Sequence, residues 1–157
     1  MSEIKIREAA FEDLEDIRRL NSELFMKEFA DFDKSLDLKW SQSALGAEYF
    51  ADRIVSSDGL VCVAEENGKV VGYLCGALVD RGYRTEGIYA ELENMFVDEK
   101  HRRLGIGKKL ADSFLQWCDK NKVRYINVTA SAKNADTIGF YRSLGFCDYD
   151  VKLQIER

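Results

Sequence analysis

The sequence lacks the features that mark membrane, exported and metal-binding proteins. None of its apolar runs approaches the ~20 residues needed to cross a bilayer, and its acidic start has no apolar h-region. Metal sites need clustered ligands, but the chain has one histidine, His101, and widely separated cysteines. We therefore expect no membrane span, no export signal and no metal.

Cysteine is sparse and unpaired in the sequence. The four cysteines form no CxxC pair and lie in apolar or strand-like contexts; they are Cys62, Cys75, Cys118 and Cys147. This usage predicts reduced thiols in the core of a cytoplasmic protein, with no redox or metal role.

The composition is that of a soluble globular protein. Hydrophobic residues make up 46% and charged residues 32% of the 157 residues, which excludes disorder as the main state and predicts one domain over residues 1–157. The net charge of −5 disfavours nonspecific binding of nucleic acid and tolerates a cationic substrate.

Hydrophobic periodicity divides the chain into strands and helices. Strands are predicted at residues 4–9, 60–66, 69–79, 88–97, 124–130 and 149–156. Helices are predicted from Phe11 to Leu24, over 41–57, from Gly105 to Cys118 and from Asn134 to Leu144, while residues 28–39 lose the helical period. Asn67-Gly68 between two strands fits a type I′ hairpin turn. The order predicts an α/β (α+β) fold, with one mixed sheet and helices on its faces.

A basic, glycine-containing segment stands between a predicted strand and a predicted helix. Gly105 and Gly107 let the backbone approach a ligand closely, and free N–H groups of the following helix would point at it. Five cations surround these glycines in an otherwise acidic chain; they are Lys100, Arg102, Arg103, Lys108 and Lys109. This pattern favours a polyanion such as a pyrophosphate. It is neither a P-loop nor a dinucleotide fingerprint, whose third glycine would fall at Leu110.

At this point the sequence resembles the GNAT superfamily of acetyl-CoA-dependent N-acetyltransferases. The family's first motif has Arg or Gln, then Gly three positions later and Gly or Ala two positions after that, matched here by Arg102, Gly105 and Gly107. Its second motif is matched at Asn134, Tyr141, Gly145 and Phe146, with Thr137 where alanine is usual. The resemblance extends from residue 4 to about residue 150.

The resemblance implies a largely antiparallel sheet with a V-shaped opening between the fourth and fifth strands, into which acetyl-CoA binds. The pantetheine arm would pair with the fourth strand, and backbone N–H groups of the basic segment would hold the pyrophosphate. The implied acetyl-CoA contacts are Met95, Phe96, Val97, Arg102, Arg103, Leu104, Gly105, Ile106, Gly107, Lys108 and Asn134. His101, beside this segment, is expected to be solvated or to contact phosphate rather than act as a base.

The resemblance also implies direct acetyl transfer to a primary amine in a ternary complex. Tyr141 matches the family's general acid, which would protonate the leaving thiolate. Glu91 and Glu93 lie two residues apart in a strand and so on one face; either could be the general base, and the sequence does not choose between them. A solvated or salt-bridged carboxylate is the alternative for each glutamate, and Asn134 could be only a helix cap.

The acceptor would be a small-molecule amine or a protein amine: a polyamine or diamine, an aminoglycoside, a lysine or an N-terminus. Acidic and aromatic residues of the helix-loop-helix after the first strand could bind such a cation, or could form a solvated face above a core; they are Glu23, Glu28, Asp31, Asp33, Asp37, Phe25, Phe29, Phe32 and Trp40.

Two rival functions and one departure from the family remain. A noncatalytic acyl-CoA-binding or regulatory module on the same fold would not depend on Tyr141 or the glutamates. A nucleic-acid-binding domain using the basic segment is disfavoured by the net charge. The family closes with two strands after Gly-Phe, but eleven residues follow Phe146 here. We therefore expect a short C-terminal hairpin, or one that a second subunit completes in a homodimer.

Overall fold

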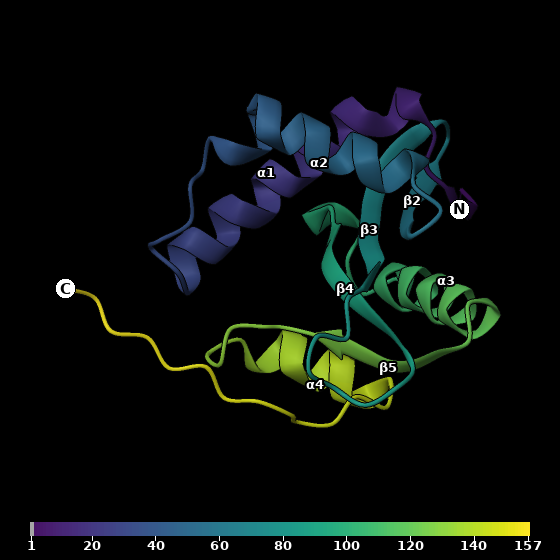
Figure 1. The fold of residues 1–157 in the computed structure, drawn as a ribbon. Coiled ribbons are helices and arrows are strands. Elements are labelled where there is room, and N and C mark those ends of the chain that lie inside the picture. The colour runs from purple at the N-terminus through teal and green to yellow at the C-terminus, as the bar shows by residue number, and fades with distance from the viewer. Residues whose placement is uncertain (1) are drawn as a thin grey trace.

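A computed structural model describes residues 2–157 and contains a five-stranded mixed sheet (Figure 1). The strands lie in chain order: β1 (Ile4–Glu8), β2 (Gly59–Glu66), β3 (Lys69–Val79), β4 (Ile88–Val97) and β5 (Val123–Val128). The first four pair antiparallel, and β5 pairs parallel with β4. The predicted fold class, a mixed and largely antiparallel sheet with helices, is confirmed.

Helices cover both faces of the sheet. The four α-helices are α1 (Leu14–Asp31), α2 (Ala44–Val55), α3 (Ile106–Lys120) and α4 (Ala135–Ser143), with short 3-10 turns η1 (Phe11–Asp13), η2 (Trp40–Gln42) and η3 (Glu99–His101). Ile17, Leu20 and Phe50 of α1 and α2 pack on one face with Val63 and Tyr73. A second cluster on the other face joins α3 and α4 to the sheet. Figure 1 shows α1 and α2 on the side opposite α3.

Local signals in the sequence placed most elements correctly. Asn67 and Gly68 both have positive φ, 51° and 79°, as a type I′ turn requires, and they join β2 to β3 in the predicted hairpin. Strand β4 occupies the predicted residues 88–97. Asn134 caps α4, since its side chain accepts a hydrogen bond from the Thr137 N–H.

A β-bulge and an early end to strand pairing open the sheet between β4 and β5. Cys75 is paired with Asn94 and Gly76 with Leu92, so that Glu93 is an extra residue in β4. Pairing of β4 with β5 ends at Leu92. Beyond it β4 continues for five residues, of which the last four, Asn94–Val97, pair with β3 only, among the residues described. The predicted V-shaped opening is therefore present.

Three predictions about the fold were wrong in part. The first helix does not stop where its period weakens but continues to Asp31. Residues 149–156, predicted as a closing strand, have no secondary structure, because no strand within residues 2–157 pairs with them. Cys62, Cys75 and Cys118 are buried as expected, but Cys147, in the irregular stretch between α4 and that segment, is exposed.

Residues 2–157 contain neither a helix that could span a membrane nor a cluster of metal ligands. None of the helices found there is long and apolar enough to cross a membrane. Nor does this part of the chain bring together three or more histidine, cysteine or carboxylate side chains that could hold a metal ion.

Gly76 is required beside the bulge. A Cβ there would lie 2.4 Å from Cε2 of Phe114 and 2.9 Å from the Glu91 backbone oxygen. Because α3 and β4 would both have to move, Gly76→Ala should lower the free energy of unfolding by about 1–3 kcal/mol. Denaturant unfolding checks this. Gly139→Ala on α4 is the control: its Cβ would meet nothing within 4 Å, so stability should hold or rise by about 0.4–1 kcal/mol. Equal losses in both variants would contradict this account.

Candidate functional site

The open edge of β4 is one wall of the candidate site. Residues 93–97 expose a strand edge on the β5 side, and β5 has already ended its pairing at Val128. An extended ligand carrying amide groups can pair with such an edge as an added strand. Met95 and Val97 pack into the α3 cluster, whereas Phe96 is buried on the opposite face.

The basic segment forms a tight loop that ends at the start of α3. Arg103 and Gly105 have positive φ, 64° and 78°, and Gly105 is the N-cap of α3. No side chain caps this helix end among the residues described, so the N–H groups of its first turn are free to bind an anion. A Cβ built on Gly105 meets nothing within 4 Å, which shows that the space in front of the loop is open.

Among the basic side chains, Arg102 holds the loop in place. Its Nε donates to the Val97 carbonyl at 3.0 Å and its guanidinium lies 5.0 Å from the Phe96 ring centroid. Lys108 pairs with Asp112 on the exposed side of α3. Arg103 and Lys109 are exposed and make no ion pair within residues 2–157. These two cations are therefore free to contact an anion.

His101 is held by carboxylates and not by solvent. Its Nε2 lies 3.0 Å from an oxygen of Glu66, in the turn region of the β2–β3 hairpin, and its Nδ1 lies 3.8 Å from Asp98. The ring is therefore not simply solvated, because η3 brings it against the hairpin, while the alternative of phosphate contact stays a prediction.

Glu93 belongs to a dense hydrogen-bonded cluster with α2. Arg53 donates to both of its carboxylate oxygens, at 2.8 and 2.9 Å, and the Tyr49 hydroxyl donates at 2.6 Å. Burial by itself would raise the pKa of Glu93, but these donors outweigh it and leave the pKa below the ordinary value. Glu93 is thus a structural carboxylate that is difficult to protonate.

The sequence did not reveal the partners of Glu93. Tyr49 and Arg53 are four residues apart, which places them on one face of α2, but nothing local links that face to a strand 40 residues away. Asn94 also joins the cluster by donating to the Tyr49 hydroxyl at 3.1 Å. Its buried Oδ1 has no hydrogen-bond donor among the residues described.

Glu91 has a different environment from Glu93. It lies on the same face of β4, as predicted, but forms no hydrogen bond or ion pair with residues 2–157. Burial raises the pKa of Glu91, and the negative charge of Glu93 raises it further, against a smaller opposing effect of Arg53. A half-buried carboxylate with a raised pKa and no partner is suited to accept a proton.

Tyr141 lies on α4, beside the opening. Its ring is buried against Phe140 and Phe146, in the same cluster as Met95 and Val97. Burial raises the pKa of the phenol to about 12, with a smaller contribution from the charge of Glu28 on α1. Its hydroxyl donates to no group of the described chain, so it remains available to a ligand.

Most of the acidic and aromatic residues that were predicted to bind the amine acceptor instead contact other residues of the chain. Trp40 packs against Phe25, Tyr49 and Phe50 and so belongs to the core instead of facing a cation. Glu23 pairs with Arg19 and Asp31 with Lys27, while Asp33 and Asp37 accept hydrogen bonds within the loop; Phe29 has Lys34 over its ring. Glu28 is half-buried and without such a partner in residues 2–157, and burial raises its pKa.

The sequence matches the model of a known protein family. The model of the acetyltransferase (GNAT) family covers residues 14–146, from α1 to the end of the second motif. The chain belongs to the GNAT acetyltransferase family. The family membership that the two motifs indicated is thereby confirmed.

Known GNAT proteins resemble the chain over most of its length. An uncharacterized N-acetyltransferase of Methanocaldococcus jannaschii is 29% identical over 151 residues, and the match spans 93% of this chain but 62% of that protein. The PaiA N-acetyltransferase of Thermoplasma acidophilum, solved with coenzyme A, superposes with a TM-score of 0.81 at 21% identity, covering 96% and 93% of the two chains. The aminoglycoside N-acetyltransferase AAC(6')-Iy, also solved with CoA, has a TM-score of 0.78 at 16% identity, covering 100% and 96%.

Arg53 should stabilise the fold through Glu93. The Arg53 and Glu93 side chains are 25% and 16% exposed, so Arg53→Gln leaves a half-buried carboxylate without its charged donor. We expect the free energy of unfolding to fall by about 2 kcal/mol, measured by urea titration at neutral pH. Arg142→Gln breaks a similarly short pair with Asp148 that is 56% and 71% exposed, and should cost much less stability because solvent screens the pair. Equal losses would show that Glu93 does not need Arg53.

Proposed function

We propose that the protein is an N-acetyltransferase that moves the acetyl group of acetyl-CoA directly to a primary amine in a ternary complex. The observation that carries the proposal is a coincidence of three features at one opening: the unpaired edge of β4, the uncapped N-terminus of α3 and the phenol of Tyr141. Family membership and two CoA-bound structural neighbours support the choice of co-substrate.

The residues at the opening fit acetyl-CoA. N–H groups from Arg103 to Lys108 and the free cations Arg103 and Lys109 would bind its phosphates. The β4 edge at Met95–Val97 would pair with the amides of its pantetheine arm, and Asn134 at the start of α4 would contact the arm with its unused amide nitrogen. When bound, acetyl-CoA supplies the acetyl thioester.

The protein's own groups would manage the protons of the transfer. An amine arrives largely protonated, because its reference pKa is near ~10.4, and must lose a proton before it can attack. We assign that role to Glu91, which has no partner, and not to Glu93, which Arg53 and Tyr49 already occupy. A backbone N–H near Met95 or Phe96 would polarise the thioester oxygen. The new C–N bond replaces the C–S bond, Tyr141 gives its proton to the departing thiolate, and the second proton of the attacking nitrogen, released as the amide forms, restores the phenol.

The acceptor proposed here is a cationic amine. Glu28 supports this choice because it is the carboxylate of the acidic segment that the chain itself does not use, and its charge reaches Tyr141. AAC(6')-Iy, whose name states that it acetylates an aminoglycoside, shares the fold. A polyamine, an aminoglycoside or a lysine-containing peptide would each present such a cation.

The test is mass spectrometry of a mixed panel of amines incubated with the protein and acetyl-CoA. We expect an acetylated product with the wild-type protein. Tyr141→Phe should slow transfer without weakening acetyl-CoA binding, because only the proton donor is lost. Gly105→Asp should do the opposite and raise the Kd for acetyl-CoA, because it places a side chain and a negative charge before the phosphate site at a positive-φ position.

The outcomes of that panel separate the functions. Binding of acetyl-CoA without acetylation of any amine would favour the noncatalytic acyl-CoA-binding module. Unchanged turnover in Tyr141→Phe would exclude its role as the acid, and unchanged affinity in Gly105→Asp would exclude the phosphate site at α3.

The choice between the two glutamates can be tested by pH. A base must be ionised, so turnover should rise with pH through the raised pKa of Glu91, with an acid limb above the ordinary glutamate range of about 4.3. In Glu91→Gln the rate should fall by about 100-fold or more and lose this limb. Glu93→Gln is the matched control: it should keep the limb, moved to lower pH because the charge that raises the pKa of Glu91 is lost, and it should lose stability. A limb that vanishes only in Glu93→Gln would reverse the assignment.

A further inference from the structure

The imidazole of His101 lies between two carboxylates, just before the loop that leads into α3. Its Nε2 is 3.0 Å from Oε2 of Glu66 at the end of β2, and its Nδ1 is 3.8 Å from Oδ2 of Asp98. Asp98 is the N-cap of η3, the short turn that carries His101. The ring therefore joins the β2–β3 hairpin to the turn from which the loop starts.

One nitrogen of this ring has no hydrogen-bond partner. Nδ1 is buried, and none of the residues described offers it a donor or acceptor within hydrogen-bond distance. A neutral imidazole carries one N–H, so in either neutral form the other nitrogen presents a lone pair to Glu66 or to Asp98. The imidazolium carries an N–H on both nitrogens. Only the protonated ring can satisfy both carboxylates at once.

The carboxylates that face the ring have no competing cation within residues 2–157. The basic side chains closest to them in register or sequence are Lys69, Lys100 and Arg102. None of these forms an ion pair with Glu66 or Asp98. Hydrogen bonds from Ser2 and then from His101 hold the pKa of Glu66 below its ordinary value. Glu66 thus stays ionised through about pH 5 to 8, the range in which histidine side chains change charge.

The contact with Glu66 anchors one side of the anion-binding loop, residues 102–107. Only residues 102–104 separate His101 from Gly105, the N-cap of α3. The other anchor is the hydrogen bond from Arg102 to the last carbonyl of β4. Because the segment between the anchors and the helix is so short, a shift of η3 would move the N–H groups that face the opening.

We propose that His101 is a positioning residue for the anion-binding loop, and that a proton on its ring, held between Glu66 and Asp98, strengthens the binding of acetyl-CoA. The inference rests on the proposed function, which makes acetyl-CoA the ligand of this loop. Charge-assisted hydrogen bonds are about twice as strong as neutral ones, so the charged ring holds η3 more firmly against the hairpin. This contribution to affinity is present while the ring is charged and is lost as the pH rises and the ring becomes neutral.

The test measures the Kd for acetyl-CoA from about pH 6 to 8.5 in the untagged wild-type protein and in His101→Gln. Glutamine keeps an uncharged donor but cannot take up the proton. We expect the Kd of the variant to exceed that of the wild type by about tenfold at the low end and about twofold or less at the high end. Each ratio is taken at one pH, so titration of the ligand's own phosphates cancels. At the low end KM for acetyl-CoA should rise while kcat changes little.

Two neighbouring glutamates provide a matched pair of variants. The side chains of Glu65 and Glu66 are both 25% exposed, but Glu65 pairs with Arg7 and not with the ring. Glu66→Gln should reproduce the pH pattern of His101→Gln. Glu65→Gln removes the same charge from the same strand end and should keep the wild-type pattern. If His101 acted by direct contact with phosphate, the wild-type pattern would survive Glu66→Gln.

The state of the ring can also be followed directly, because His101 is the only histidine in the sequence and its imidazole NMR signals are unambiguous. Coupling between two equilibria is reciprocal. If the protonated ring favours the ligand, saturating CoA must therefore move the midpoint of the imidazole titration to higher pH.

The proposal is overturned if that midpoint does not move, if the Kd ratio is the same at every pH, or if Glu66→Gln keeps the wild-type pattern. These results would leave the proposed function intact, since acetyl-CoA would still bind. A wild-type protein that binds no acetyl-CoA at any pH would overturn the proposed function and this inference together.

Discussion

Backbone pairing along β4 stops part-way on one side, and the arrangement of the site depends on this. The extra residue at Glu93 shifts the register of β4 against β3. Beyond Leu92, no strand within residues 2–157 pairs with β4 on its β5 side. A continuous sheet at that point would leave no unpaired edge for a ligand. Gly76 makes the bulge possible, because a side chain there would collide with Phe114 and with the β4 backbone. The opening is thus built from strand geometry, and the helices only surround it.

The bulge also gives two similar glutamates different chemistry. Both lie on the α2 face of β4, but Glu93 reaches Arg53 and Tyr49 whereas Glu91 does not. The pKa of Glu93 is lowered by its donors despite burial, and the charge that this maintains helps to raise the pKa of Glu91. Glu93 is therefore held as an ionised carboxylate by its hydrogen bonds, and its charge makes Glu91 easier to protonate. Such separation of pKa values within a pair is typical of acid–base sites.

The sequence predicted what short-range patterns determine. Asn67-Gly68 specified its hairpin because two positive φ values are a local requirement, and Asn134 specified a helix start because its side chain bonds three residues ahead. The two-residue spacing of Glu91 and Glu93 correctly placed them on one face. The sequence did not predict features that depend on long-range contacts. These are the contact of α2 with Glu93, the packing of Trp40 in the core, and the exposure of Cys147. Each depends on which elements meet across the sheet, and periodicity carries no information about that.

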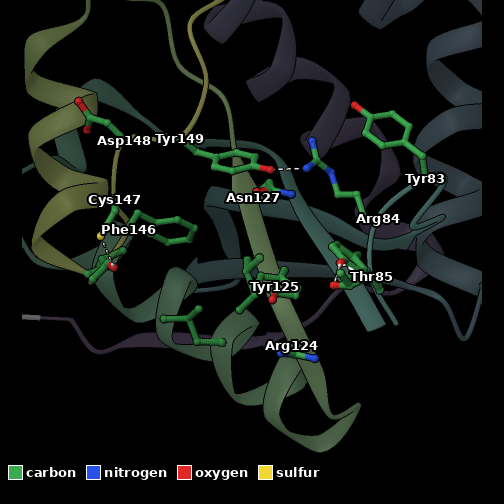
Figure 2. A pocket seen from close by; sticks show the side chains of 15 residues that line it. Tyr83, Arg84, Thr85, Arg124, Tyr125, Asn127, Phe146, Cys147, Asp148 and Tyr149 are labelled. Carbon is green, nitrogen blue, oxygen red and sulfur yellow. Dashed lines mark hydrogen bonds between the residues drawn. The ribbon is translucent and has the colours of Figure 1, made fainter. Parts of the chain in front are cut away.

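The C-terminal segment also shows that a local pattern can predict a strand without predicting its partner. Its alternation of apolar and polar residues indicates a strand with one buried face, and the chain leaves that segment extended but unpaired. A strand exists through hydrogen bonds to a neighbour, so a local pattern can fix which face is apolar without fixing the partner. On the same molecule, β5 has a free edge beside a groove whose lining includes Leu115, Ile126 and Phe146 (Figure 2). The apolar face of the segment and the free edge of β5 are therefore both local features, and whether they pair depends on contacts that the local pattern does not encode.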